Sequence, residues 1–162
     1  FIQMILLAKM LEVCSTTLPQ MILPHVYSAP EFQPYLQERI EKYHRRATEA
    51  VEYFSTIPNM RVTMPGGVFY FVVELLDLPR AKLSAKTKTV RLYIDDLLDS
   101  SEVAPDFQFA YELMGAEGVC VVPLSGFGST LNGFRMTLLQ EDDEIFTETL
   151  HQIGEAVVEY YS

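Results

Sequence analysis

Residues 133–139 read GFRMTLL, the alternating pattern of a β-strand with one buried face. Successive side chains of a strand point to opposite faces, so Arg135 and Thr137 lie on one face and the apolar side chains beside them on the other. The apolar side chains are those of Phe134, Met136 and Leu138. Because they need a core, the Arg135 guanidinium is directed away from it. The pattern predicts a sheet that is buried on this apolar face.

The segments on either side of this strand extend the pattern. Residues 119–122 predict a short strand that runs into the loop at 123–128. A phosphate-binding glycine loop is followed by a helix, whereas a strand follows here, so we interpret this loop as a structural turn. Asp142 and Asp143 are suited to cap a last helix. The inward positions of that helix are Ile145, Phe146, Thr149, Leu150, Ile153, Val157 and Tyr160.

Helical periodicity is strongest over residues 32–54, where apolar side chains recur at steps of three and four. The charged residues, which we expect mostly on the solvent side, are Glu38, Arg39, Lys42, Arg45 and Arg46. Residues 1–27 predict a helix that breaks at Pro19 and Pro24, with an irregular connector at 18–21. A further helix is predicted from Pro105. Its expected buried face is Phe107, Ala110, Tyr111 and Met114.

Two more strands are predicted at 61–64 and 68–73, joined by a tight turn at Pro65, Gly66 and Gly67. The second run is apolar throughout, which predicts a central strand covered on both faces. The order of elements predicts an α+β fold, a small mixed or antiparallel sheet with helices packed on one side.

Composition narrows the classes of partner. The chain of 162 residues is 49% hydrophobic, enough for one core, and its net charge of −10 repels nucleic acid and anionic membranes. The apolar start at residues 1–7 is too short to span a bilayer. Cys14 and Cys120 lack the spacing of a metal or disulfide site, and we expect both to be buried, reduced thiols. A reducing compartment fits this interpretation.

Arg135 is the candidate functional residue. An arginine in mid-strand, held on a rigid element among apolar residues, is positioned for a bidentate pair with a carboxylate. The alternative is an arginine that only covers an exposed sheet face, and the spacing does not decide between them. Asp95, Asp96 and Asp99 are interpreted as a helix start or a solvated loop. We find no triad or metal-ligand spacing among the histidines and cysteines.

Several segments, in order, resemble the C-terminal small domain of class I/II aminotransferases, which are pyridoxal-phosphate enzymes of fold type I. Residues 118–128 and 133–139 carry the resemblance, which is closest to the alanine aminotransferase branch. Residues 65–70 resemble the glycine-aromatic strand of the family, and residues 104–118 its late helix. Residues 14–20 are similar to the crossing from the large to the small domain.

The resemblance implies amino-group transfer between an L-amino acid, such as alanine, and a 2-oxo acid. Arg135 stands at the position of the arginine that binds the substrate α-carboxylate. Gly67 and Phe69 would border the substrate pocket. Residues 1–27 would be a helix and connector from a large domain, and residues 28–162 the small domain of an enzyme that forms a homodimer.

What the family needs for catalysis is expected before Phe1, in a large domain. That domain carries the Schiff-base lysine and the phosphate-binding loop, and none of the lysines in this chain matches that lysine's sequence setting. They are Lys9, Lys42, Lys82, Lys86 and Lys88. The chain also has Leu124 where the family usually has glycine. We therefore expect no catalytic, cofactor-binding or metal-binding residue here, an inactive chain when isolated, and a cytoplasmic or mitochondrial parent enzyme.

Two other interpretations stay open. The chain could be a stand-alone module that binds a carboxylate or a protein partner without catalysis, or a catalytically inactive remnant kept for dimer contacts. If the chain is instead the small domain of an aminotransferase, the large domain would cover residues 1–11 and 18–23, which are strongly apolar. The isolated chain is then expected to self-associate through them.

Overall fold

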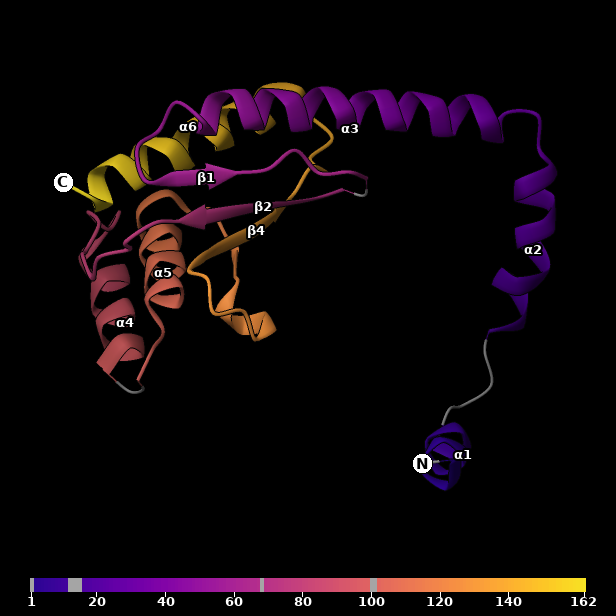
Figure 1. The fold of residues 1–162 in the computed structure, drawn as a ribbon, viewed down its shortest axis with the longest axis horizontal. Coiled ribbons are helices and arrows are strands. Elements are labelled where there is room, and N and C mark those ends of the chain that lie inside the picture. The colour runs from indigo at the N-terminus through magenta and orange to yellow at the C-terminus, as the bar shows by residue number, and fades with distance from the viewer. Residues whose placement is uncertain (1, 12–15, 68, 100–101) are drawn as a thin grey trace. The chain divides into compact units, whose positions relative to one another are not determined.

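The computed structural model of the chain describes residues 2–11, 16–67, 69–99 and 102–162. These residues divide into two units, 1–41 and 42–162, which are described separately below. Figure 1 shows the elements and their order along the chain.

The first unit is helical. It contains α1 (Ile2–Leu11), α2 (Thr17–Ser28) and the start of α3 (Phe32–Phe54), which runs across the division. The predicted break at Pro19 and the irregular connector are wrong, because Pro19 lies in the first turn of α2, where its missing N–H is not needed. The helix also continues through Pro24, whose carbonyl accepts a hydrogen bond of 2.7 Å from Ser28 Oγ.

Large apolar side chains of α1 and α2 are exposed to solvent. They are Ile2, Met4, Ile5, Leu6, Leu7, Leu18, Met21, Ile22, Leu23, Val26 and Tyr27. Self-association of the isolated chain stays a prediction, which light scattering over a range of concentrations would check.

A four-stranded antiparallel sheet organises the second unit. Its strands are β1 (Met60–Val62), β2 (Tyr70–Leu75), β3 (Val122–Pro123) and β4 (Gly133–Thr137), in the order β1-β2-β4-β3. The helices of this unit are the later part of α3, α4 (Lys88–Asp99), α5 (Pro105–Glu117) and α6 (Asp143–Tyr160). The predicted α+β class is confirmed.

The sheet has one buried and one open face. On the buried face, side chains of β2 and β4 join those of α3, α5 and α6 in one core. The sheet contributes Phe71, Val73, Leu75, Phe134 and Met136. Tyr70 and Val72 on β2 are 37% and 47% exposed. The alternation predicted for β4 is therefore confirmed, whereas the prediction that the apolar strand β2 is covered on both faces is wrong.

Gly133 begins β4 at a point where β2 approaches very closely. Its φ is +151°, and a Cβ there would lie 2.1 Å from the Val73 carbonyl oxygen. Only glycine fits this approach without moving the strand. Gly133 thus fixes where β4 starts and which face Arg135 takes.

The helix predicted at 32–54 is confirmed, but the surroundings of Arg46 are not those expected. Its side chain is 1% exposed and donates to the carbonyl oxygens of Leu138, at 2.8 Å, and Gln140. It also pairs with Asp143 at 2.5 Å. Arg46 therefore joins α3 to the end of β4 and the start of α6, which lies alongside α3 in Figure 1.

Helix α4 is absent from the predicted order. Its Arg91 forms a bidentate pair with Glu112 on α5, with N···O distances of 2.6 and 2.9 Å. Asp95 lies in the second half of α4 and pairs with Lys82 and Arg91 at 2.7 and 3.0 Å. The interpretation of this acidic cluster as a helix start or loop is therefore wrong. Ion pairs of Arg91 and Asp95 hold α4 to Glu112 on α5 and to Lys82.

The faces of the last two helices are partly as predicted. On α5, Ala110 is buried, but Met114 is 39% exposed and Phe107 and Tyr111 are half-buried. The helix is instead buried through Asp106, Gln108, Phe109, Ala110, Glu112, Leu113, Gly115 and Ala116, because the sheet, α4 and α6 all contact it. On α6 the predicted cap is confirmed, since Asp142 accepts from the N–H groups of Glu144 and Ile145. Ile145 itself is exposed.

The prediction of buried thiols is wrong for Cys120, which is exposed, and Cys14 lies outside the described residues. Alternation along this segment buries Val121 and turns its neighbour outward. None of the described helices combines the length and the apolar character that a bilayer crossing needs. Within the described ranges, no three His, Cys, Asp or Glu side chains gather as a metal site.

Candidate functional site

Arg135 lies in the middle of β4, on the open face of the sheet. Its register partners are Val72 on β2 and Val122 on β3. Two aromatic rings contact its guanidinium, and each ring centroid is 4.2 Å from the guanidinium carbon. The rings belong to Tyr70 on β2 and Phe127 in the turn after β3. Because these strands flank β4, the rings reach Arg135 from its two sides.

The described residues accept no hydrogen bond from the guanidinium donors of Arg135. Among the described residues, no hydrogen bond or ion pair is made by this side chain, although its position on β4 is half-buried. The other arginines of the second unit donate to acceptors within the described residues. Arg45 and Arg46 donate to Asp143, Arg61 to Glu74 and Arg91 to Glu112, whereas Arg80 donates to the Gln108 side chain and the Val103 carbonyl. An aromatic-flanked guanidinium with free donors is suited to a planar oxygen acceptor such as a carboxylate.

A short turn presents Phe127. Residues 125–127 form a 3-10 helix, which ends at Gly128 in the left-handed conformation, with φ of 73°. Ser125 anchors the turn to α5, since its backbone N–H and its hydroxyl both donate to the Asp106 carboxylate. The expectation that this loop is a structural turn is consistent with these bonds.

The two residues expected to border the pocket behave differently. The ring of Phe69 lies 4.6 Å from that of Tyr70, so Phe69 extends the aromatic surface beside Arg135. Its carbonyl also accepts from the Leu138 N–H at 2.9 Å. Gly67 is exposed, and a Cβ there would meet no atom within 4 Å. Its position at the border of the pocket stays a prediction.

Sequence reasoning missed Tyr70 and Phe127 as parts of the site. The available signal for Tyr70 was the alternation of β2, which places it on the face opposite to Phe71. No comparable signal existed for Phe127, because its position depends on a turn anchored to a distant helix.

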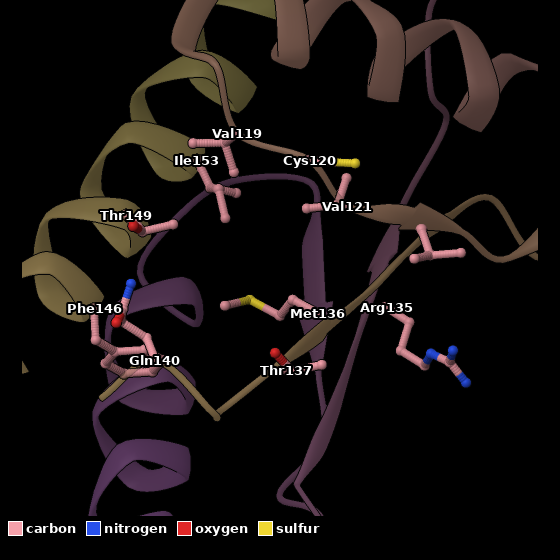
Figure 2. A pocket seen from close by; sticks show the side chains of 11 residues that line it. Val119, Cys120, Val121, Arg135, Met136, Thr137, Gln140, Phe146, Thr149 and Ile153 are labelled. Atoms are coloured by element: carbon pink, nitrogen blue, oxygen red, sulfur yellow. The ribbon is translucent and has the colours of Figure 1, made fainter. Parts of the chain in front are cut away.

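A cavity of about 220 Å³ lies beside β4, and Arg135 is one of its lining residues. The lining also includes the side chains of Met136, Gln140, Phe146, Thr149 and Ile153. Figure 2 shows these side chains gathered together, whereas the guanidinium of Arg135 points away from them. Arg135 thus lines the edge of this cavity, and its guanidinium lies apart from the side chains gathered near α6.

Three of the four lysines of the second unit are bonded within the described residues, and the fourth, Lys88 at the start of α4, has no described contact with Arg135. Lys42 donates to the Glu141 carbonyl, Lys82 pairs with Asp95, and Lys86 donates to the Glu117 carbonyl. A Schiff-base lysine needs a free amine close to the substrate. These described residues do not fit that cofactor, and we derive no catalytic step through it.

No protein-family model matches the chain. The sequence is 32% identical over 163 residues to an uncharacterized aminotransferase of Methanocaldococcus jannaschii, an alignment that covers 99% of this chain. The chain spans 37% of the length of that relative.

Solved aminotransferases share the fold. An aspartate aminotransferase from Rhizobium meliloti matches 94% of this chain, with a TM-score of 0.68 at 21% identity, over 34% of its own length. An aromatic aminotransferase from C. albicans matches 86% of this chain, with a TM-score of 0.56 at 16% identity, over 28% of its own length. In sequence and in fold, the chain is therefore similar to about one third of an aminotransferase.

Proposed function

We propose that this chain is the C-terminal small domain of a pyridoxal-phosphate-dependent aminotransferase, with residues 28–162 as the domain proper. Its part in the reaction is to bind the α-carboxylate of the substrates through Arg135. The observation that carries this proposal is the aromatic-flanked guanidinium on the open sheet face, which makes no ion pair with the described residues. The sequence similarity to an aminotransferase supports the same assignment.

Arg135 would hold the carboxylate through two parallel N–H···O bonds. The rings of Tyr70 and Phe127 would limit the rotation of the guanidinium, so less freedom is lost when the ligand binds. An L-amino acid and its 2-oxo acid both carry this carboxylate. One arginine therefore serves both directions of amino-group transfer.

The remaining chemistry belongs to residues outside this chain. Pyridoxal phosphate supplies the electron sink of aminotransferases, and we expect a large domain to hold it. We propose that this large domain also completes a homodimer. L-alanine and pyruvate are the first substrate pair to test, because the sequence resembles the alanine aminotransferase branch most closely.

The test joins the chain to the coding region that precedes it in its gene. The joined protein is expected to bind pyridoxal phosphate and to transaminate, whereas the 162-residue chain alone develops no lysine-linked cofactor absorbance. Arg135→Lys is expected to raise KM for L-alanine and for pyruvate about 30- to 100-fold, since the second N–H···O bond to a charged group is lost.

Arg61→Lys is the matched control, because Arg61 is an exposed arginine of β1 that pairs with Glu74. It is expected to leave both KM values unchanged. An Arg135→Lys enzyme with unchanged KM values would refute the carboxylate role. A joined protein that binds carboxylates but never transaminates would instead favour the non-catalytic binding module.

A further inference from the structure

We propose that Asp106 is a positioning residue for Arg135, acting through the turn that carries Phe127. Asp106 lies on α5 and does not touch the guanidinium; it holds Ser125, the turn then places the Phe127 ring, and the ring fixes the plane of the guanidinium. The consequence for substrate affinity rests on the proposed function, but the effect on Arg135 itself does not.

The carboxylate of Asp106 is fully buried in the first turn of α5. A buried carboxylate is strongly destabilising unless hydrogen bonds replace its water. Both of its oxygens accept from Ser125: the backbone N–H donates at 2.8 Å and the hydroxyl at 2.5 Å. Within the described residues no cation pairs with Asp106. Its buried charge is therefore directed to one residue of the turn.

Capping of α5 does not explain these bonds. The N-cap of α5 is Ala104, which makes no side-chain cap hydrogen bond. The Asp106 carboxylate accepts from Ser125 and not from the first N–H groups of its own helix. The charge still favours the N-terminal turn of the helix. Its hydrogen bonds, however, connect α5 to the residue two before Phe127.

The turn itself is tied at both ends. Leu124 N–H donates to the Gly133 carbonyl at 3.0 Å, and Gly128 N–H donates to the Ser125 carbonyl at 3.0 Å. Gly126 packs so closely on α5 that a Cβ there would lie 3.3 Å from the Phe107 ring. The turn is therefore seated on the start of α5, and Asp106 provides its polar anchor.

Phe127 needs such an anchor because the core does not hold its ring. The side chain is 55% exposed, and its ring centroid lies 4.2 Å from the Arg135 guanidinium carbon. Since few apolar contacts fix it, its place depends on the backbone of the turn. A loosened turn would free the ring and, with it, one side of the guanidinium.

The test follows the Arg135 Nε–H signal by NMR in the 162-residue chain. Asp106→Asn removes one acceptor from Ser125, and it is expected to lower the order parameter of Arg135 Nε–H and to change its ring-current shift. Phe127→Ala is expected to reproduce the loss of order. With acetate and L-alanine as probes, affinity falls about two- to fivefold in both variants, the range of an exposed cation–π contact.

Glu112→Gln is the matched control. Glu112 is the other buried carboxylate of α5, at 1% exposure, and it pairs with Arg91 and not with the turn. This variant is expected to lose stability while the Arg135 signals stay as in the wild type. If Asp106→Asn also leaves those signals unchanged, Asp106 is purely structural and the proposal is overturned.

Ser125→Ala is the second variant if Asp106→Asn does not fold. It keeps the backbone donor at 2.8 Å and removes only the hydroxyl, so a partial loss of Arg135 order is expected, and no loss contradicts the proposal. The two proposals also fail separately. If Asp106→Asn loosens Arg135 but the wild type binds neither acetate nor L-alanine, the positioning role stands and the carboxylate role fails.

Discussion

Two arginines of the second unit occupy contrasting environments. Arg46 on α3 is 1% exposed, and its donors are bonded to two backbone carbonyls and to Asp143. Arg135 on β4 is half-buried, and its guanidinium is contacted by two aromatic rings and, among the described residues, by no acceptor. The first joins elements of the fold, whereas the second makes no hydrogen bond with the described residues.

The contrast separates structural from functional arginines by their donors and not by their burial. A guanidinium has five N–H donors, and leaving them unsatisfied in a partly buried place is unfavourable. A protein that needs an arginine only for structure bonds those donors internally, as at Arg46. Arg135 makes no such bond with the described residues and lies between two aromatic rings, which is the arrangement that the proposed carboxylate-binding role requires.

The largest expected effect is the loss of stability when the structural arginine, Arg46, is replaced. Arg46→Met keeps much of the side-chain volume but leaves the carbonyls of Leu138 and Gln140 without their donor. We expect a loss of about 2–3 kcal/mol in the free energy of unfolding, measured in urea. Arg135→Met is the matched control and should lose less than about 1 kcal/mol. Equal losses in the two variants would remove the distinction drawn between them.

The pH dependence of stability tests the structural role of Arg46 through its partner Asp143. The hydrogen bond from Arg46 lowers the pKa of the Asp143 carboxyl below its ordinary value of 3.8. A carboxyl whose pKa is lower in the folded state stabilises the fold above its unfolded pKa, and this contribution is lost as the pH falls through the folded pKa. Urea unfolding at pH values above and below 3.8 should therefore show acid destabilisation that Asp143→Asn reduces.

Arg135→Gln serves as the control for this titration, because no described carboxylate pairs with Arg135. Its acid destabilisation should follow the wild type. High salt is expected to weaken the effect at Asp143, which is an exposed group. If Asp143→Asn keeps the full acid dependence, the Arg46 pair contributes nothing measurable to it.

The sequence was sufficient to place Arg135, because strand alternation is a local rule and three apolar neighbours fix its phase. Arg46 is the opposite case, because its environment was predicted wrongly. Its spacing from Ala50 and Phe54 is four and eight residues, which puts it on the buried stripe of α3. Its charge led to the prediction that it faces solvent. The acceptors that allow its burial lie at 138–143, far along the chain, and a local sequence pattern does not reveal them.

The surroundings of Arg135 were less accessible than its position. Tyr70 reaches it only because β2 pairs with β4 in one register, which joins residues more than sixty positions apart. Phe127 reaches it through a turn that a buried carboxylate on α5 holds. Both contacts come from tertiary structure, so a sequence pattern predicts the binding group but not the aromatic setting that prepares it.

The smallest expected effect is the aromatic contact itself. In a double-mutant cycle of Phe127→Leu and Arg135→Met, the coupling energy is expected to be about 0.5–1 kcal/mol, the range for cation–π pairs at exposed sites. Leucine keeps apolar bulk at a position that is 55% exposed, so the single variant should change stability very little. The coupling, measured by urea unfolding of the four proteins, therefore reports the ring and not the burial. A coupling near zero would mean that the ring only lies beside the guanidinium without restraining it, and the free donors of Arg135 would then be the whole difference from Arg46.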